Sequence, residues 1–85
     1  MSRKGRMEAL LTRLARTPQA VTFIEIREVC EHYFTFDRQD GSHRIYKTGL
    51  VEPAIVNIQP RGKMAKPYQC RQVAGAVKAK LKGGQ

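Results

Sequence analysis

The chain has 85 residues and a mass of 9.6 kDa, the size of one small domain spanning 1–85. Hydrophobic residues make up 41% and charged residues 27%, a globular balance that argues against disorder, and no apolar run approaches the roughly 18 residues that cross a bilayer. Sixteen Lys and Arg against seven Asp and Glu give a net charge of +9, which favours a polyanionic partner and, in a cytoplasmic protein, nucleic acid.

The positive charge is concentrated toward the C-terminus. Every acidic residue lies at or before Glu52, whereas residues 53–85 hold seven basic residues and no acidic one. An alternative is that the charge serves solubility alone. It explains a net charge of +9 less well, because a small domain needs a net charge of only about 2–8 of either sign. Residues 2–6 are polar and basic and no apolar stretch follows them, so we expect no secretory signal and a cytoplasmic location.

Two helices are predicted in the N-terminal part of the chain. We expect residues 1–6 to be frayed and flexible, followed by a first helix that starts at Met7 and that Pro18 ends. Thr22 followed by Glu25 is a capping box, which predicts a second helix over about Phe23–His32. The apolar stripes of these helices are Met7, Leu10, Leu11 and Leu14, then Phe23, Ile26, Val29, Cys30 and Tyr33.

The hydrophobic period changes to two after the second helix. This predicts strands over Phe34–Asp37, Ser42–Lys47 and Ala54–Gln59, and Asp40-Gly41 supplies turn residues for a hairpin between the first two. On the middle strand, alternation puts Ser42, Arg44 and Tyr46 on one face and His43, Ile45 and Lys47 on the other.

A third helix is predicted near the C-terminus. Residues 61–66 have no periodicity and are expected to form a loop, whereas Pro67 suits the first helical position and Gly83-Gly84 would end the helix, with 83–85 flexible. Its apolar stripe is Cys70, Val73, Ala74, Val77 and Leu81. The order α-α-β-β-β-α predicts a small α+β fold, in which helices pack on one face of a three-stranded antiparallel sheet and a partner meets the other face or an edge.

The cysteines do not form a metal-binding pattern. Cys30 and Cys70 lie in no Cys-x-x-Cys motif and have no His or carboxylate at a ligand spacing. We interpret both as buried, reduced core residues and expect neither a metal nor a cofactor.

Two histidines are candidates for proton transfer near neutral pH. His32, at the end of the second helix, is interpreted as a solvated or C-capping residue. His43 follows Gly41-Ser42 at the start of a strand, where a surface histidine and a catalytic one both fit the pattern. The carboxylates form no cluster of the kind that a two-metal nuclease needs, so any phosphodiester cleavage is expected to proceed without metal.

The segment from Arg61 to Gln72 is dense in hydrogen-bond donors. Lys63 and Lys66, together with free amides at the start of the third helix, predict a phosphate site, and the alternative is a solvated loop that keeps the domain soluble. Tyr68 fits two interpretations equally, stacking on a base or packing on the sheet.

Two motifs resemble a known family. Gly41-Ser42-His43-Arg44-Ile45-Tyr46 resembles the Gly-Ser-His-x-Ile-aromatic motif of HicA-type toxins, the small toxins of bacterial toxin–antitoxin pairs. Asn57-Ile58-Gln59 and the stretch from Gly62 to Gln72 are similar to the longer form of that family, in which a strand ending in Asn-Leu-Gln precedes Gly-Lys-x-Ala-Lys-Pro-Tyr-Gln-x-Arg-Gln. The resemblance extends over Met7 to Leu81.

The resemblance implies a fold similar to a double-stranded-RNA-binding domain and an endoribonuclease, an mRNA interferase, that cleaves mRNA without metal. The catalytic histidine of the family's motif falls on His43, and the partner would be a HicB-type antitoxin. We expect the residues that contact RNA to be Arg44, Arg61, Lys63, Lys66, Tyr68 and Arg71.

The chain also departs from the family's pattern. Arg44 stands where many members have a second histidine, and Arg61 precedes Gly62 where short-form members have His-Gly. No second catalytic group is therefore transferred, and His43 fits either as the base for the ribose 2′-hydroxyl or as the acid for the leaving 5′-oxygen. Two other classes of function fit the sequence, a non-catalytic RNA-binding module and a basic accessory protein that binds another protein.

Overall fold

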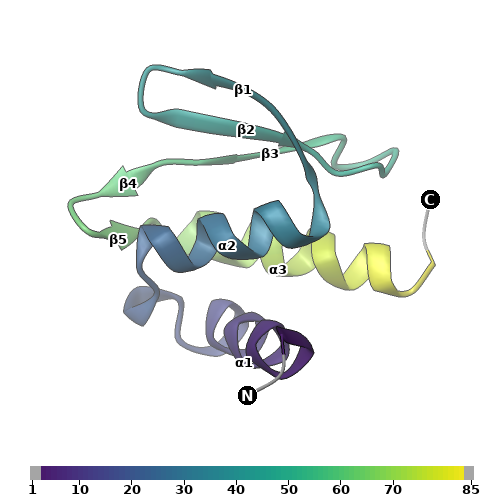
Figure 1. Cartoon of the computed structure of the whole chain (residues 1–85), viewed down its shortest axis with the longest axis horizontal. Coiled ribbons are helices and arrows are strands. Elements are labelled where there is room, and N and C mark those ends of the chain that lie inside the picture. The colour runs from purple at the N-terminus through teal and green to yellow at the C-terminus, as the bar shows by residue number, and fades with distance from the viewer. Residues whose placement is uncertain (1–2, 84–85) are drawn as a thin grey trace.

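A computed structural model describes residues 3–83 (Figure 1). The helices are α1 (Arg3–Arg16), α2 (Phe23–Tyr33) and α3 (Pro67–Leu81), with a short 3-10 turn η1 (Pro18–Ala20) between the first two. The strands are β1 (Thr35–Asp40), β2 (His43–Lys47), β3 (Ile55–Ile58), β4 (Pro60–Arg61) and β5 (Met64–Ala65). The chain is thus a small α+β domain in the predicted order, to which a short β4–β5 hairpin is added.

The fold is layered. Strands β1, β2 and β3 form an antiparallel sheet in that order, and helices α2 and α3 lie along one side of it (Figure 1). Helix α1 packs on α3 and α2 at the side away from the sheet, so it belongs to a second helical layer. In the part of the chain that the structure describes, no helix covers the opposite face of the sheet (Figure 1).

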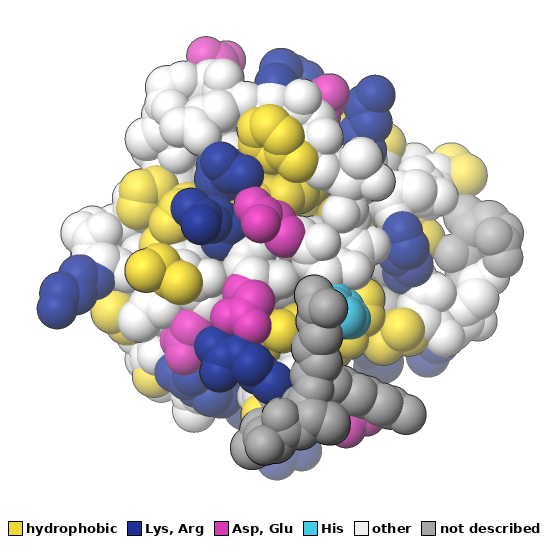
Figure 2. Space-filling view, viewed as in Figure 1, with side chains coloured by type: hydrophobic (Ala, Val, Ile, Leu, Met, Phe, Trp, Pro, Cys, Tyr) yellow, Lys and Arg dark blue, Asp and Glu magenta, His cyan; other side chains and the backbone are white. Residues whose placement is uncertain are grey.

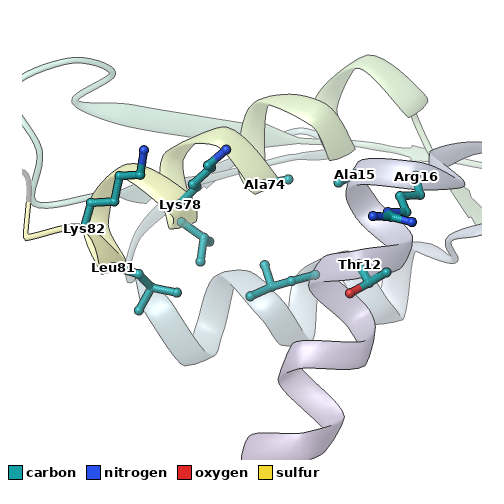
Figure 3. A pocket seen from close by; sticks show the side chains of 9 residues that line it. Thr12, Ala15, Arg16, Ala74, Lys78, Leu81 and Lys82 are labelled. Carbon is teal, nitrogen blue, oxygen red and sulfur yellow. The ribbon is translucent and has the colours of Figure 1, made fainter.

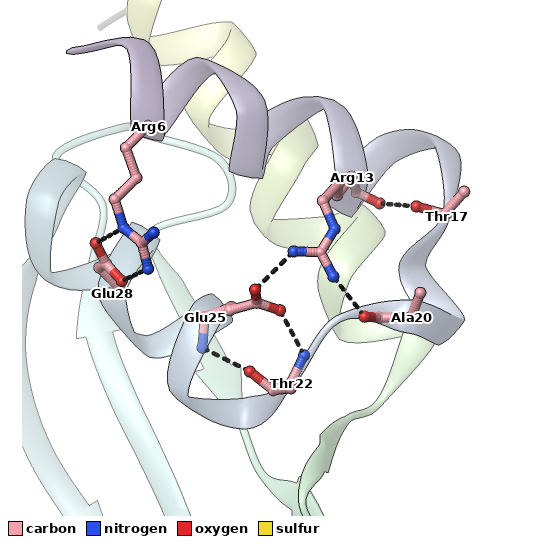
Figure 4. Close-up of polar contacts among 7 residues, drawn as sticks. All are labelled: Arg6, Arg13, Thr17, Ala20, Thr22, Glu25 and Glu28. Carbon is pink, nitrogen blue, oxygen red and sulfur yellow. Dashed lines mark hydrogen bonds and ion pairs between the residues drawn. The ribbon is translucent and has the colours of Figure 1, made fainter. Parts of the chain in front are cut away.

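Helix α1 starts earlier than predicted. It includes residues 3–6, which the sequence analysis expected to be frayed, whereas Met1, Ser2, Gly84 and Gln85 lie outside the described residues. The physical reason is a contact across the helices: the Arg6 guanidinium donates to both carboxylate oxygens of Glu28, at 2.6 and 2.8 Å (Figure 4). The predicted end is confirmed, because α1 stops at Arg16, before Pro18.

The predicted capping box is present at the start of α2. The Glu25 amide donates to Thr22 Oγ1 at 3.2 Å, and the Thr22 amide donates to the Glu25 carboxylate at 2.9 Å (Figure 4). Arg13 donates to the other oxygen of Glu25 at 2.6 Å and to the Ala20 carbonyl, also at 2.6 Å. The cap therefore starts α2 and also attaches it to α1.

The three predicted strands exist, with different ends. β1 continues to Asp40 instead of ending at Asp37, because a bulge between Phe36 and Arg38 lets the ladder with β2 continue. The hairpin turn is consequently Gly41–Ser42 rather than Asp40-Gly41, with Gly41 at φ +62° in its first position. β3 is one residue shorter at each end than predicted.

The expectation of a loop over residues 61–66 was wrong. Arg61 pairs with Met64 and Pro60 with Ala65, around a turn in which Gly62 has φ +62°. The hairpin is held by the residues at the start of α2. The Ala65 amide donates to the Val21 carbonyl, and the Phe23 amide donates to the Lys63 carbonyl, each at 2.9 Å. Two-residue strands are too short to leave a periodic pattern in the sequence.

The core confirms the predicted stripes, with one exception. Residues expected to be buried are at most 1% exposed, namely Leu14, Ile26, Val29, Val73 and Val77. Cys30 and Cys70 are buried free thiols, and burial raises the pKa of Cys70 to about 11. Leu81, the last member of the α3 stripe, is 63% exposed instead. Over residues 3–83, no helix combines the length and the apolar character that a membrane span requires.

Candidate functional site

His43 is the first residue of β2 and lies on the uncovered face of the sheet. Tyr46 is fully buried and its hydroxyl donates to Glu31 of α2, so Tyr46 faces the helices. Alternation along β2 then directs His43, three residues earlier, to the opposite face. Asp40 is the ladder partner of His43 on β1 and shares that face. The histidine is half-buried and adjoins the Gly41–Ser42 turn, a position that a substrate can approach.

Asn57 orients the imidazole. His43 Nδ1 lies 3.0 Å from Asn57 Oδ1. An amide oxygen can only accept a hydrogen bond, so Nδ1 holds the proton of the neutral ring and Nε2 has the free electron pair. The β2–β3 ladder produces this pairing, because Ile45 is opposite Asn57 and the two residues share a face.

Gln59 connects the same end of the sheet to α3. Lys66 Nζ donates to Gln59 Oε1 at 2.6 Å, and Gln59 Nε2 donates to Ser42 Oγ at 3.2 Å. Because Arg44 pairs with Ile58, His43 and Gln59 follow as the next residues of the two strands at this end. We call the resulting group of side chains the His43 cluster; its members are Ser42, His43, Asn57, Gln59 and Lys66.

Arg71 adjoins this cluster along a groove. Asn57 and Ile55 of β3 line a groove of about 340 Å³ together with Arg71 and Gln72 of α3. Asn57 therefore contacts His43 and also forms part of the groove wall. The Arg71 side chain is exposed and forms no ion pair within residues 3–83, so its charge is open to an anion in the groove.

Arg44 is separated from His43. Its Nε donates to the Tyr46 hydroxyl at 3.1 Å, its Nη2 donates to Glu31 at 2.9 Å, and its guanidinium lies 4.4 Å from the centre of the Phe36 ring. The hydrogen bond to Tyr46 and the charge of Glu31 raise the pKa of Arg44, and burial raises the pKa of Tyr46 to about 12. Arg44 thus has its partners on the helix side of the sheet, and the structure does not bring it together with the other predicted RNA contacts.

Three further predicted RNA contacts lie on and beside the β4–β5 hairpin. Arg61 and Lys63 are exposed on the hairpin, and Tyr68 is 54% exposed in the first turn of α3. Of the two interpretations of Tyr68, burial against the sheet is therefore excluded; its hydroxyl accepts from Gln69 Nε2 at 3.3 Å. These three side chains extend the basic surface from Lys66 of the His43 cluster onto the hairpin and the start of α3.

The start of α3 is a weaker anion site than the sequence suggested. Pro67 has no amide proton, and the amides of Gln69 and Cys70 donate to the Lys66 carbonyl at 3.0 and 3.1 Å. Few free amides are left there to bind a phosphate. The positive charge of Lys63, Lys66 and Arg71 is therefore the main feature of this region that attracts anions.

The acidic residues are used elsewhere. In residues 3–83, the ion pairs join basic and acidic side chains that all lie at or before Lys47. Figure 2 shows acidic side chains beside basic ones across the middle of one face. The basic side chains from Arg61 onward have no such partners in the described part of the chain.

Sequence reasoning gave no role to Asn57 or Gln59. The available signal was two amides in alternate positions of the predicted strand Ala54–Gln59, which is otherwise aliphatic. Alternation in the predicted strand places both on one face, but only the register with β2 shows that Asn57 lies on the same face as His43.

Comparisons with known proteins assign neither a family nor a function. No family model, no curated protein and no solved structure matches the chain. Within residues 3–83, no three His, Cys, Asp or Glu side chains gather in a group that could hold a metal ion. The candidate site is therefore a half-buried histidine that contacts Asn57, with Lys66 linked to the same strand end through Gln59 and Ser42 and with exposed basic side chains around it.

Proposed function

We propose that this protein is a metal-independent endoribonuclease that cleaves mRNA, the toxin of a HicA-like toxin–antitoxin pair, with a fold similar to a double-stranded-RNA-binding domain. The observation that supports this most is the His43–Asn57 contact on the uncovered face of the sheet, at the strand end where Gln59 links Ser42 to Lys66. A basic domain that only binds RNA has no need of a histidine held in one proton arrangement.

His43 acts as the general base. Its Nε2 takes the proton of a ribose 2′-hydroxyl, the 2′-oxygen attacks the neighbouring phosphorus, and the bond from phosphorus to the 5′-oxygen breaks. Water supplies the proton to the leaving 5′-oxygen, so the products are a 2′,3′-cyclic phosphate and a 5′-hydroxyl. Asn57 is a positioning residue that holds Nδ1–H and leaves Nε2 unprotonated.

Lys66 stabilises the charge that develops on the phosphorane. Gln59 accepts from one of the three ammonium protons, and the other two remain for phosphate oxygens. Because Gln59 also contacts Ser42 beside the histidine, Lys66 is held near the reacting group rather than moving freely in water. Pre-oriented cations of this kind cost little reorganisation during the reaction.

Arg61, Lys63 and Arg71 bind the phosphates on either side of the cleaved bond, and the exposed ring of Tyr68 stacks on a base. A HicB-type antitoxin inhibits the enzyme by placing carboxylates where these cations would otherwise hold phosphates. RNA and antitoxin therefore compete for one surface, and His43 lies beneath both.

The test is cleavage of a labelled single-stranded RNA by the purified chain and by its His43→Ala variant, with and without EDTA. We expect His43→Ala to fold normally and to lose about 10²–10⁴-fold in rate. Cleavage by the unaltered chain should persist in EDTA and leave a 2′,3′-cyclic phosphate or its 3′-phosphate product.

The outcomes separate the possible functions. Unchanged cleavage by His43→Ala removes the proposed mechanism, and loss of cleavage in EDTA indicates a metal-dependent enzyme instead. RNA binding without any cleavage by the unaltered chain identifies a non-catalytic RNA-binding module.

A further inference from the structure

A second groove lies between α1 and α3, in the helical layers and not on the sheet face that holds His43 (Figure 3). Its volume is about 450 Å³. The floor is formed by aliphatic side chains from both helices, chiefly Leu11, Ala15, Ala74, Val77 and Leu81. None of the groove's lining residues belongs to the His43 cluster.

The floor of this groove is an incompletely buried continuation of the core. Leu81 continues the α3 stripe that includes Val73 and Val77, but it is 63% exposed, whereas Val77 is buried. Leu11, which lines the same groove, is partly buried. An exposed apolar side chain in line with a buried stripe favours contact with another apolar surface. The opening is therefore suited to the apolar side of a partner.

The rim of the groove is basic. Arg16 from α1 and Lys78 and Lys82 from α3 line it, and Figure 3 shows both lysines extending from the same side of α3. Within residues 3–83 none of these three cations forms an ion pair, and no acidic residue lines the groove. Lys78 and Lys82 are four residues apart on one helix, a like-charged pair that an added carboxylate would stabilise.

We infer that this groove binds an acidic amphipathic helix of a partner protein. An apolar floor with a basic rim is complementary to a helix that has a hydrophobic stripe and Asp or Glu on either side of it. The inference does not depend on RNA cleavage, because the groove and the His43 cluster share no residue.

The composition of the groove disfavours other occupants. No aromatic ring lines it, so nucleic-acid bases have nothing to stack on, and a phosphate bound by the rim cations would leave the aliphatic floor uncovered. A second copy of this chain placed through α3 is also a poor match, because α3 has no acidic residue and its charged positions are all basic.

The test is selection of helical peptides against the full chain. A displayed library of randomised peptides of about 18 residues, five helical turns, is panned, and enriched sequences are synthesised with a fluorescent label. We expect enrichment of Leu or Phe at helical spacing flanked by Asp and Glu. In anisotropy titrations, Leu81→Ser and Lys78→Glu should each weaken the Kd about tenfold or more.

Matched variants outside the groove control for hydrophobicity and charge. Val51→Ser removes an apolar side chain that is 82% exposed in the β2–β3 loop, and Lys63→Glu reverses a charge on the β4–β5 hairpin. Both should bind the peptides with unchanged affinity. The exposed positions of Leu81 and Lys78 mean that thermal unfolding should also be unchanged in the groove variants.

Three results would overturn the inference. One is the absence of acidic amphipathic sequences among the selected peptides; another is peptide binding that Leu81→Ser and Lys78→Glu leave intact. The third concerns Lys78→Glu: this variant could leave peptide binding unchanged but bind a labelled RNA, or phosphatidylglycerol vesicles, more weakly. That result would assign the groove to nucleic acid or to lipid.

Discussion

At the scale of single residues, the proposed chemistry depends on a hydrogen bond that only the sheet provides. His43 Nδ1 meets Asn57 Oδ1 at 3.0 Å because the β2–β3 register places both on the uncovered face. Arg44, the next residue, has the opposite orientation and pairs with Glu31 and Tyr46. Of these two adjacent residues of β2, His43 thus belongs to the candidate site and Arg44 contacts α2.

The role of Asn57 can be tested by comparing two substitutions. Asn57→Ala removes the acceptor for Nδ1–H, and we expect cleavage to fall by roughly tenfold to a hundredfold, part of the about 10²–10⁴-fold that a positioned base contributes. Asn57→Asp retains an acceptor and should keep most of the rate. Because a carboxylate stabilises the imidazolium, the pH–rate profile of Asn57→Asp should shift to higher pH.

Initial rates on one RNA across a pH series measure both effects. The rate should rise with pH when His43 is the base and fall with pH when it is the acid. Equal rates for Asn57→Ala and the unaltered chain would show that Asn57 does not position the histidine.

At the scale of elements, the β4–β5 hairpin and the start of α2 depend on each other. The hairpin bonds to Val21 and Phe23 on either side of the capping residue Thr22, and this contact presents Arg61 and Lys63 to solvent. The same cap bonds through Glu25 to Arg13 of α1. One short segment therefore organises both the helical layers and the basic hairpin.

Charge reversal on the hairpin should affect RNA binding without affecting the fold. In the His43→Ala background, Lys63→Glu should weaken binding of a labelled RNA, since it replaces an attraction to phosphate by a repulsion. Stability should change by no more than about 0.5 kcal/mol, because Lys63 is exposed. Lys82→Glu, at the other end of α3, changes the net charge equally and should bind RNA nearly as well; equal weakening by both variants would mean that binding follows net charge alone.

The capping box predicts a dependence of stability on pH. Burial would raise the pKa of Glu25, but the hydrogen bonds from Arg13 and Thr22 outweigh it and lower that pKa below the ordinary value of a glutamate. A lowered folded-state pKa contributes stability that is complete above the unfolded value and disappears as pH falls through the folded one. The unfolding midpoint should therefore decrease on acidification, more in the unaltered chain than in Glu25→Gln.

Thermal unfolding from about pH 7 to about pH 3 measures this difference. Glu8→Gln is the control, because within residues 3–83 the Glu8 carboxylate forms no ion pair. A profile for Glu25→Gln as steep as that of the unaltered chain would contradict the role of the cap.

At the scale of the whole molecule, one core joins all the layers. The buried cluster includes Leu14 of α1, Ile26 of α2, Val77 of α3 and Val56 of the sheet. A domain of 85 residues has a small core, so each of these side chains contributes a large share of its stability.

Truncation within this core should destabilise the protein strongly. Val77→Ala or Leu14→Ala should lower the free energy of unfolding by on the order of 1–4 kcal/mol, because each leaves a cavity at the junction of the layers. Urea unfolding followed by circular dichroism measures the change. Val51→Ala, at an 82% exposed position, should differ from the unaltered chain by less than about 0.5 kcal/mol, and a similar loss in both variants would contradict the packing described.

The basic surface as a whole predicts the salt dependence of RNA binding. If Arg61, Lys63, Lys66 and Arg71 each neutralise one phosphate of a single strand, a plot of log K against log salt should have a slope of about −3. Titration of the His43→Ala protein with RNA over a salt series gives this slope. A HicB-type antitoxin should displace the RNA, and simultaneous binding without mutual weakening would place the two partners on different surfaces.

The sequence alone determined those features whose causes are local. Capping residues, proline positions and apolar spacing predicted α2 and α3 closely, the end of α1, the existence of three strands and the burial of residues such as Val77. These patterns are reliable because helix caps and side-chain periodicity act over a few neighbouring residues. His43 became a candidate through its position after a turn and through a motif that resembles a known family, and its catalytic role stays a prediction.

Only the tertiary structure decided which of those residues meet. The Asn57–His43 contact, the orientation of Arg44 away from the site and the β4–β5 hairpin all depend on strand register or on contacts between distant segments. The exposure of Leu81 depends likewise on where α1 crosses α3. A shift of register by one residue would move every side chain of a strand to the other face, and periodicity within a single strand contains no information about its partner.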